Sequence, residues 1–237
     1  MPDRQQGLSI FFPCYNDKGT IGRLVADAKK TAQKLTNDFE IIVIDDGSSD
    51  GSREFLRELE PQVPELRVIF HEKNRGYGGV LQTGFGAATK DLVFYTDGDG
   101  QYDVNELRLL WERMRDGIDV VNGYKLKRSD ALHRIVIGAV YRDVMRFFFR
   151  LPIKDPDCDF RLIRRTVFEK VKLVRNSGTV TIELVKKIHR AGFIFAQVGV
   201  HHYERTYGSS QFFSFRRVAK TLWQLMFLWI ELMILRK

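Results

Sequence analysis

The sequence Leu92-Val93-Phe94-Tyr95-Thr96-Asp97-Gly98-Asp99-Gly100-Gln101 decides the fold. Its first five residues have the length and the β-branched and aromatic content of a buried strand. The two glycines that follow relax the backbone, so that the side-chain oxygens of Asp97, Asp99 and Gln101 can converge. Hard oxygen ligands of this kind suit Mg²⁺ or Mn²⁺. We therefore predict a divalent-metal site at the end of this strand.

Working outward, apolar runs of strand length alternate with segments of helical periodicity. Strands are expected at Leu8–Phe12, Phe39–Ile44, Leu66–Phe70, Leu92–Thr96, Asp119–Asn122 and Phe193–Val200. Helices are expected between the early strands, at about residues 131–150 and at Phe215–Leu235. This alternation predicts an α/β domain with a mostly parallel, Rossmann-like central sheet flanked by helices.

A second strand ends in acidic residues, since Phe39–Ile44 runs directly into Asp45-Asp46-Gly47-Ser48. In an open α/β sheet, ligands bind where the carboxyl ends of the strands line up. Carboxylates crowded at one edge are unfavourable unless a cation neutralises them. A plain turn also explains Asp and Gly after a strand. The glycine-rich passage 74–79 matches neither the Walker loop nor the dinucleotide fingerprint.

Composition and charge narrow the class of partner. The chain has 237 residues and a net charge of +8, which indicates an anionic partner; nucleic acid, anionic lipid and phosphorylated substrates all qualify on charge alone. Two cysteines without metal-type spacing fit a reducing compartment. The polar residues 1–7 show no apolar signal segment, and Glu231 interrupts the last apolar stretch too early for a membrane span. We therefore expect a cytoplasmic protein.

Five motifs, in order along the chain, resemble family 2 glycosyltransferases with the GT-A fold. They are similar above all to polyprenyl-phosphate glycosyltransferases of the dolichyl-phosphate mannose synthase type. The motifs are Pro13-Cys14-Tyr15-Asn16-Asp17, Asp45-Asp46-Gly47-Ser48, Asp97-Gly98-Asp99-Gly100-Gln101, Asp155-Pro156-Asp157-Cys158-Asp159-Phe160-Arg161 and Arg205-Thr206-Tyr207-Gly208-Ser209-Ser210. Cys14 departs from the usual small or β-branched residue. Many relatives carry transmembrane helices after the catalytic domain, whereas this sequence ends at Lys237.

The resemblance implies a metal-dependent, inverting enzyme that moves a sugar from a UDP- or GDP-linked donor to a polyprenyl or dolichyl phosphate, with no nucleic-acid partner. Carried over residue by residue, it implies the following roles. The nucleotide-sugar would contact Pro13, Tyr15, Asn16, Asp17, Asp45, Asp46, Gly76, Gly78, Asp97 and Gly98. Mg²⁺ or Mn²⁺ would be held by Asp97, Asp99 and Gln101. Catalytic roles would fall to Asp99, Asp155 and Asp157. The acceptor phosphate would meet Lys125, Arg128, Arg134, Arg205 and Ser210.

The acceptor decides whether a base is required. A hydroxyl must lose its proton, so a positioned carboxylate such as Asp157 would help by about 10²–10⁴-fold. A lipid phosphate is already an anion at pH 7 and needs a basic clamp instead. Further candidates for that clamp are Arg161, Arg164 and Arg165. Two alternatives stay open: transfer to a glycan or protein hydroxyl, and a catalytically inactive membrane-binding module on the same fold.

Residues 213–237 are expected to form an amphipathic helix appended to a catalytic domain of residues 1–212. Its apolar stripe consists of Val218, Leu222, Leu225, Met226, Trp229, Leu232 and Met233. Helices of this kind lie in the headgroup plane, which predicts peripheral contact at the inner face of the membrane. A second candidate is the helix that carries Arg142, Arg146 and Arg150 beside residues 147–149. A helix–helix core contact or a homodimer seam explains the same patterns.

Overall fold

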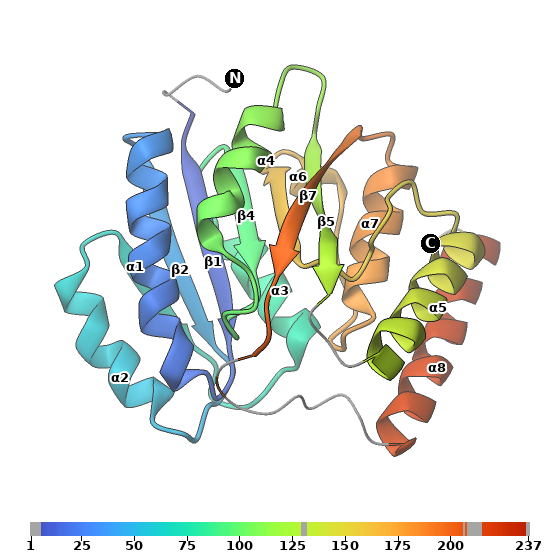
Figure 1. The fold of residues 1–237 in the computed structure, drawn as a ribbon, viewed down its shortest axis with the longest axis horizontal. Coiled ribbons are helices and arrows are strands. Elements are labelled where there is room, and N and C mark those ends of the chain that lie inside the picture. Colours follow the sequence, from blue (N-terminus) through green and yellow to red (C-terminus); the bar gives the residue numbers. More distant parts are fainter. Residues whose placement is uncertain (1–5, 129–131, 206, 208–214, 236–237) are drawn as a thin grey trace.

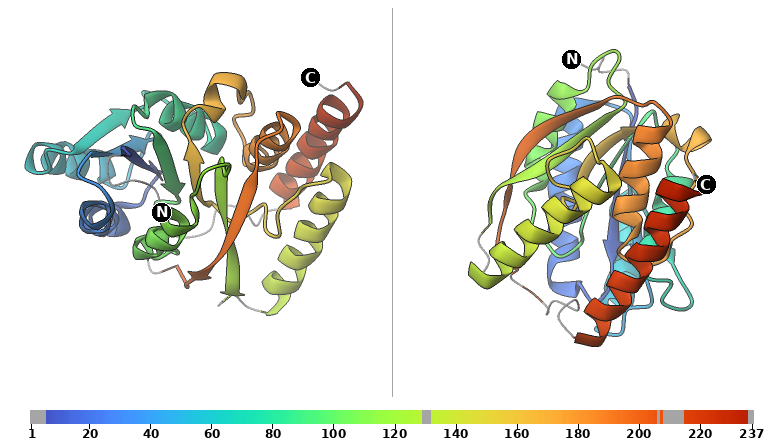
Figure 2. Two further views of the ribbon diagram at one scale, coloured as in Figure 1. Left: turned by 90° about the horizontal axis from the view of Figure 1, so that it is seen from above. Right: turned by 90° about the vertical axis from the view of Figure 1, so that its right-hand side faces the viewer.

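The computed structural model describes residues 6–128, 132–205, 207 and 215–235. They form a seven-stranded sheet in the order β3-β2-β1-β4-β6-β5-β7, with helices on both faces (Figures 1 and 2). The strands are β1 (Leu8–Cys14), β2 (Phe39–Asp45), β3 (Leu66–Phe70), β4 (Leu92–Thr96), β5 (Val120–Arg128), β6 (Phe160–Arg164) and β7 (Phe195–His202). All neighbouring pairs are parallel except the two that involve β6. The predicted mostly parallel α/β sheet is confirmed.

The helices cover the apolar faces of the sheet. They are α1 (Lys18–Leu35), α2 (Ser52–Leu59), α3 (Tyr77–Ala87), α4 (Leu107–Arg113), α5 (Leu132–Phe149), α6 (Val167–Lys170), α7 (Val180–Arg190) and α8 (Phe215–Trp229). Short 3-10 turns lie at Glu60–Gln62 and Val104–Glu106, and a π-helical turn, η3, continues α8 at Ile230–Ile234. One core cluster joins α1 and α4 to the sheet, and a second joins α3 and α7 to the opposite face.

Strand β6 is absent from the sequence-based expectation. It lies between β4 and β5 and runs antiparallel to both. Because it runs in reverse, its amino-terminal end shares an edge with the carboxyl ends of the other strands. The acidic loop 154–159 is thereby brought to the edge where the other acidic strand ends lie.

A third apolar cluster packs α5, α7 and α8 together. Leu225, Leu228 and Leu232 are almost fully buried in it. The indole Nε1 of Trp229 donates a hydrogen bond to the backbone oxygen of Phe148 at 2.9 Å. This face of α8 is therefore a core contact, one of the alternatives that the sequence left open. The boundary predicted between residues 212 and 213 lies outside the described residues.

Of the predicted apolar stripe, Leu225 and Leu232 belong to the core. Among the α8 side chains that the structure describes, the large apolar ones left exposed are Leu222, Trp223, Met226 and Phe227. Within the described ranges, no helix is both long and apolar enough to cross a bilayer.

Core packing of α8 predicts a stability difference between two identical substitutions. Leu228 is 1% exposed and Leu222 is 57% exposed. Leu228→Ala should lower the free energy of unfolding by about 2–4 kcal/mol, because it removes buried methyl groups and leaves a cavity. Leu222→Ala should change it by less than about 0.5 kcal/mol. Urea unfolding followed by circular dichroism measures both, and equal small effects would show that α8 is not docked.

Candidate active site

The end of β1 and the loop after β4 approach so closely that only glycine fits at residue 98. A Cβ atom on Gly98 would lie 2.2 Å from the backbone oxygen of Pro13. The hydroxyl of Thr20, at the start of α1, donates to the backbone oxygen of Gly98 at 2.7 Å. Pro13 and Gly98, both predicted to contact the nucleotide-sugar, are therefore neighbours at the carboxyl edge of the sheet.

Asp45 ends β2 and is fully buried, with one oxygen left without a partner. Its Oδ1 accepts hydrogen bonds from the amides of Gly47 and Ser48, and from Nη1 of Arg53 at 2.7 Å. Its Oδ2 is buried and has no hydrogen-bond partner among the described residues. An unmet buried acceptor costs about 1–3 kcal/mol. A ligand N–H or O–H group that reached this buried oxygen would satisfy it.

Asp46, the next residue, is occupied by contacts within the protein. Its Oδ1 is 2.6 Å from Nδ1 of His71 and accepts from the amide of Arg75 at 2.8 Å. Its Oδ2 accepts from the amide of Gly76 at 2.9 Å. Asp46 thus fixes the glycine-rich loop, and a direct contact with the nucleotide-sugar stays a prediction.

Residues 174–179, which we call the strap, pass so close to the start of α3 that positions 76 and 78 must be glycine. A Cβ atom on Gly76 would lie 2.4 Å from the backbone oxygen of Asn176, and one on Gly78 would lie 1.9 Å from that of Arg175. The amide of Gly78 donates to the Asn176 oxygen at 3.0 Å. The structure explains both glycines by this close approach.

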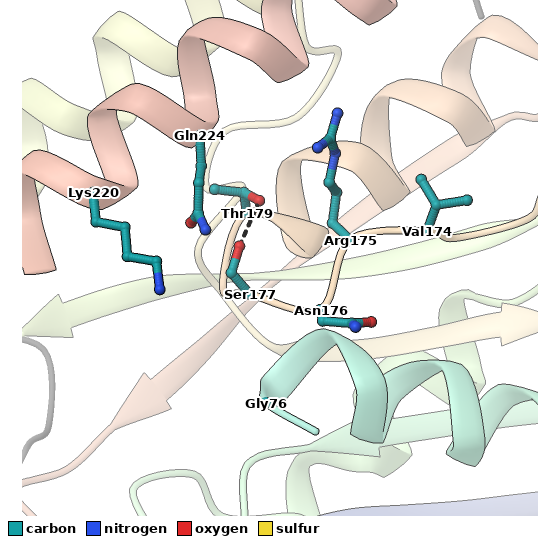
Figure 3. Close-up of a pocket in the computed structure, with 8 residues that line it drawn as sticks. All are labelled: Gly76, Val174, Arg175, Asn176, Ser177, Thr179, Lys220 and Gln224. Atoms are coloured by element: carbon teal, nitrogen blue, oxygen red, sulfur yellow. Dashed lines mark hydrogen bonds between the residues drawn. The ribbon is translucent and has the colours of Figure 1, made fainter. Parts of the chain in front are cut away.

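A pocket of about 420 Å³ opens between the start of α3, the strap and α8 (Figure 3). It is lined by Gly76, Val174, Arg175, Asn176, Ser177, Thr179, Lys220 and Gln224. The guanidinium of Arg175 is paired with the carboxylate of Glu231. The pocket therefore has α8 as one wall and the start of α3 as another.

Asn16 and Tyr15 lie in the loop after β1. The amide of Asn16 donates to the hydroxyl of Ser48, and the side-chain oxygen of Asn16 accepts from the amide of Ser49 at 2.8 Å. Asn16 adopts a positive φ of 59°, a conformation that asparagine tolerates well. These bonds join the two acidic loops and leave the ring of Tyr15 42% exposed.

Asp97 lies in the densest group of carboxylates. The hydroxyl of Tyr77 donates to its Oδ1 at 2.6 Å. Burial, followed by the charges of Asp159 and Asp99, raises the pKa of Asp97 well above its ordinary value. A bound divalent cation would favour the ionised forms of Asp97 and Asp99. These two carboxylates therefore fit the predicted metal.

Asp99 forms an ion pair with Arg205. Nη2 of Arg205 donates to Oδ2 of Asp99 at 2.5 Å, and the amide of Gln101 donates to its Oδ1. The side-chain amide of Gln101 donates to the backbone oxygen of Tyr203 at 3.0 Å. In the part of the chain that the structure describes, no three His, Cys, Asp or Glu side chains are grouped to hold a metal. Two carboxylates would thus supply the protein ligands, and phosphate oxygens and water the rest.

The structure places Arg205, a predicted acceptor-phosphate residue, beside the predicted metal ligand. The same segment continues to Tyr207, whose ring would lie 2.4 Å from a Cβ on Gly19 at the start of α1. Burial raises the pKa of Asp17 to about 6; Asp99 raises it as well, and the guanidinium of Arg205 opposes that shift. Arg205 therefore lies between the predicted nucleotide and metal positions.

Asp155 organises the acidic loop before β6. It is buried, its Oδ1 accepts from the amide of Asp157 at 3.3 Å, and its Oδ2 accepts from the amide of Lys125 at 3.5 Å. The amine of Lys125 donates to the backbone oxygen of Asp157 at 3.1 Å. Lys125 and Asp157 are thus brought together, and their roles towards the acceptor and the sugar stay predictions. Ser210 and the side chains of Arg128 and Arg134 lie outside the described residues.

Two arginines proposed for the basic clamp are placed differently. Arg161 is 1% exposed, and its guanidinium donates to Asp159 at 2.7 Å and to Asn122 at 2.5 Å. Arg164 donates to the backbone oxygen of Ile118 at the opposite edge of the sheet. The prediction is wrong for both, because it ignored the reversed direction of β6. Sequence reasoning also missed Tyr77, although a tyrosine between two glycines after a strand was a usable signal.

The sequence of this chain matches the model of glycosyl transferase family 2 over residues 9–172. The chain belongs to this family. The match begins in β1 and ends just after α6, so it contains the strand ends that carry Asp45, Asp97 and Asp99. The resemblance drawn from the five sequence motifs is confirmed.

Curated relatives include undecaprenyl-phosphate 4-deoxy-4-formamido-L-arabinose transferases. The protein of this name from Yersinia enterocolitica is 29% identical over 207 residues, which cover 86% of this chain and 62% of the relative. That from Pectobacterium atrosepticum is 28% identical over 228 residues, which cover 95% of this chain and 68% of the relative. The chain thus spans less than two thirds of the Yersinia protein.

Among solved structures, the fold is similar to glucosyl-3-phosphoglycerate synthase from Mycobacterium tuberculosis. Its complex with Mn²⁺, UDP and glucosyl-3-phosphoglycerate gives a TM-score of 0.67 at 20% identity, covering 86% of this chain and 74% of that one. Its complex with Mn²⁺ and UDP-glucose gives 0.70 at 17% identity, covering 96% and 79%. The likeness concerns the fold and confirms the predicted GT-A architecture.

The ion pair between Arg205 and Asp99 predicts that Arg205 competes with a metal in the absence of nucleotide. Arg205→Ala should tighten the binding of Mn²⁺ alone by roughly threefold to tenfold, since a partly exposed charged hydrogen bond is worth about 1 kcal/mol. Titration of free Mn²⁺ by electron paramagnetic resonance measures this affinity. Arg108→Ala, which removes an exposed arginine of α4, is the control and should change nothing. Unchanged or weaker binding in Arg205→Ala would contradict the competition.

Proposed function

We propose that the chain is a metal-dependent, inverting glycosyltransferase that moves a sugar from a UDP- or GDP-linked donor to a polyprenyl phosphate at the cytoplasmic face of the membrane. The observation that carries this proposal is the carboxylate edge. Asp45 presents an unpaired oxygen, and Asp97 and Asp99 form a donor pair for a cation at the same edge. A nucleoside diphosphate offers a base and a metal-binding diphosphate for these two features.

Asp45 favours bases that carry a ring N–H. Uracil and guanine both present such a donor, whereas cytosine and adenine do not in their usual forms. The buried Oδ2 of Asp45 would accept that hydrogen bond, and the exposed ring of Tyr15 would stack on the base. UDP and GDP donors both satisfy this requirement.

Asp97 and Asp99 would hold the cation, with Tyr77 orienting Asp97. A metal that bridges the diphosphate stabilises the charge on the leaving oxygen by several kcal/mol. Arg205, once displaced from Asp99, would remain close enough to neutralise a phosphate at the same place. The third predicted ligand, Gln101, could offer its side-chain oxygen to the metal, because its contact with Tyr203 uses the side-chain nitrogen.

A lipid phosphate is the acceptor that the site favours over a hydroxyl. Asp155 is buried and both its oxygens accept from amides of the protein, so it is poorly placed to take a proton from a hydroxyl. Asp157 lies near the ammonium group of Lys125, which suits an anionic acceptor. The relatives named for undecaprenyl phosphate support this acceptor class. The pocket of Figure 3, with Lys220 on one wall, would receive part of that acceptor.

Membrane contact would come from α5 and α8, which lie side by side at one end of the molecule (Figures 1 and 2). Their exposed apolar side chains are Val140, Val144, Phe147, Phe148, Leu222, Trp223, Met226 and Phe227. We name this surface the membrane face. Aromatic and aliphatic side chains on paired amphipathic helices suit the boundary between headgroups and acyl chains.

The proposal is tested by transfer to the lipid acceptor. Purified protein with Mn²⁺ should label undecaprenyl phosphate from one of a panel of UDP- and GDP-sugars that includes 4-deoxy-4-formamido-L-arabinose, and EDTA should abolish labelling. Asp157→Asn should lower kcat by less than about tenfold with the phosphate acceptor, which needs no base. A hydroxyl acceptor would instead give a loss of about 10²–10⁴-fold. Absence of labelling with every donor would overturn the proposal.

The role of Asp45 is tested separately from the metal. Asp45→Asn should weaken UDP or GDP binding by roughly tenfold to a hundredfold, the value of a buried charged hydrogen bond of about 1.5–3 kcal/mol. The affinity of the variant for Mn²⁺-pyrophosphate, which has no base, should stay within about twofold of the wild-type value. Isothermal titration calorimetry measures both ligands on one preparation. An equal loss for both would indicate general damage to the site and not base recognition.

A further inference from the structure

The end of α5 carries an arginine in a backbone conformation that disfavours it. Arg150 has a φ of +49°. The amide of Leu151 donates to the backbone oxygen of Arg146 at 3.1 Å, and the amide of Arg150 donates to that of Phe147 at 3.3 Å. This is the Schellman ending of a helix, in which glycine is usual at the position of Arg150. A side chain kept in such a conformation motivates a search for its function.

A second cation, Lys186, lies on α7, which packs against α5. Phe149 and Val185, the residues next to these two cations in sequence, pack in the same apolar cluster. Lys186 is 9% exposed, and its pKa is lowered by burial and then by the charges of Arg150 and Arg190. Like charges that are brought together in this way repel one another.

The two central residues of this group are Lys186 and Arg150. Among the described residues, neither Lys186 nor Arg150 forms an ion pair with an acidic side chain. The carbonyl end of α7 accounts for Arg190, which lies in the last turn of that helix. It does not account for Lys186, which lies one turn earlier and is largely buried. An anion from outside the chain would compensate both charges.

The basic cluster adjoins the membrane face and lies away from the catalytic edge. Phe147, which is 79% exposed, precedes Arg150 by one helical turn. Strand β5 points towards the start of α5, near the catalytic edge. Helix α5 has 18 residues, so Arg150, just beyond its end, lies about 25 Å along the helix axis from that start. The acceptor phosphate and an anion at Arg150 therefore occupy different places.

We propose that Arg150 and Lys186, with Arg190 beside them, bind the phosphate headgroup of an anionic phospholipid. The inference rests on the peripheral membrane contact proposed above and adds a headgroup site to it. Exposed phenylalanines beside a phosphate site suit a lipid, whose acyl chains continue below the headgroup, better than a free phosphate. Cations at the bilayer surface gain from the negative potential of anionic lipid.

The test compares wild-type protein with Arg150→Gly/Lys186→Gln in vesicle flotation. Glycine suits the positive φ at residue 150, so the double variant should keep its fold while losing two charges. Affinity for vesicles of phosphatidylcholine with 30% phosphatidylglycerol should fall roughly tenfold to thirtyfold, at about fivefold per cation. Affinity for pure phosphatidylcholine vesicles should stay within about twofold, since it depends on the apolar side chains.

Lys30→Gln/Lys34→Gln is the matched control, because it removes two exposed charges from α1, on the far side of the sheet. At physiological salt these charges are screened from the bilayer, and binding should change by less than about twofold. The inference is overturned if the two double variants lose equal affinity, or if Arg150→Gly/Lys186→Gln binds anionic vesicles as tightly as the wild type.

Two further measurements separate the sources of the anion and the two proposals. If inorganic phosphate raises the thermal midpoint only when Arg150 and Lys186 are present, while vesicle binding ignores them, the site serves a soluble anion and the lipid inference falls. Transfer to a short-chain polyprenyl phosphate in detergent should be unchanged in the double variant. If no sugar is transferred but vesicle binding still depends on Arg150 and Lys186, the proposed enzyme activity is refuted and the headgroup site is retained.

Discussion

Repulsion among carboxylates at one edge of the sheet is the constraint to which the rest of the structure responds. Asp97, Asp99 and Asp159 lie close enough that burial and mutual charge raise the pKa of Asp97. Each is balanced by another group: Tyr77 on Asp97, Arg205 on Asp99, and Arg161, two residues further along the chain, on Asp159. These partners balance only part of the charge at the edge, since the pKa of Asp97 stays raised.

The origin of these balancing groups explains the topology. Arg53 reaches Asp45 from α2, and Arg161 reaches Asp159 from β6. The reversed direction of β6 places Arg161 under the acidic loop, with its guanidinium enclosed by Asn122 and Tyr95. An arginine enclosed in this way supports the site by holding carboxylates in position, although it cannot touch an acceptor.

The sequence predicted features that depend on neighbouring residues and missed those that depend on distant ones. Apolar runs gave β3 and β4 with their observed bounds, and the acidic strand ends were found because spacing alone marks them. Strand β6 was missed because Arg161 and Arg164 interrupt its apolar pattern. The engagement of Asp46 depends on His71, and no local pattern joins the two. Periodicity showed that α8 is amphipathic, but it could not show that Leu225 faces the core.

The contact between Gly78 and the strap also governs how the edge can open. Because the backbone oxygen of Arg175 occupies the space of a side chain at residue 78, the first turn of α3 cannot move towards the strap. The pair formed by Arg175 and Glu231 ties the strap to η3. Any opening of the edge on this side must therefore begin with the strap and the end of the last helix, two segments far from the acidic strand ends in sequence.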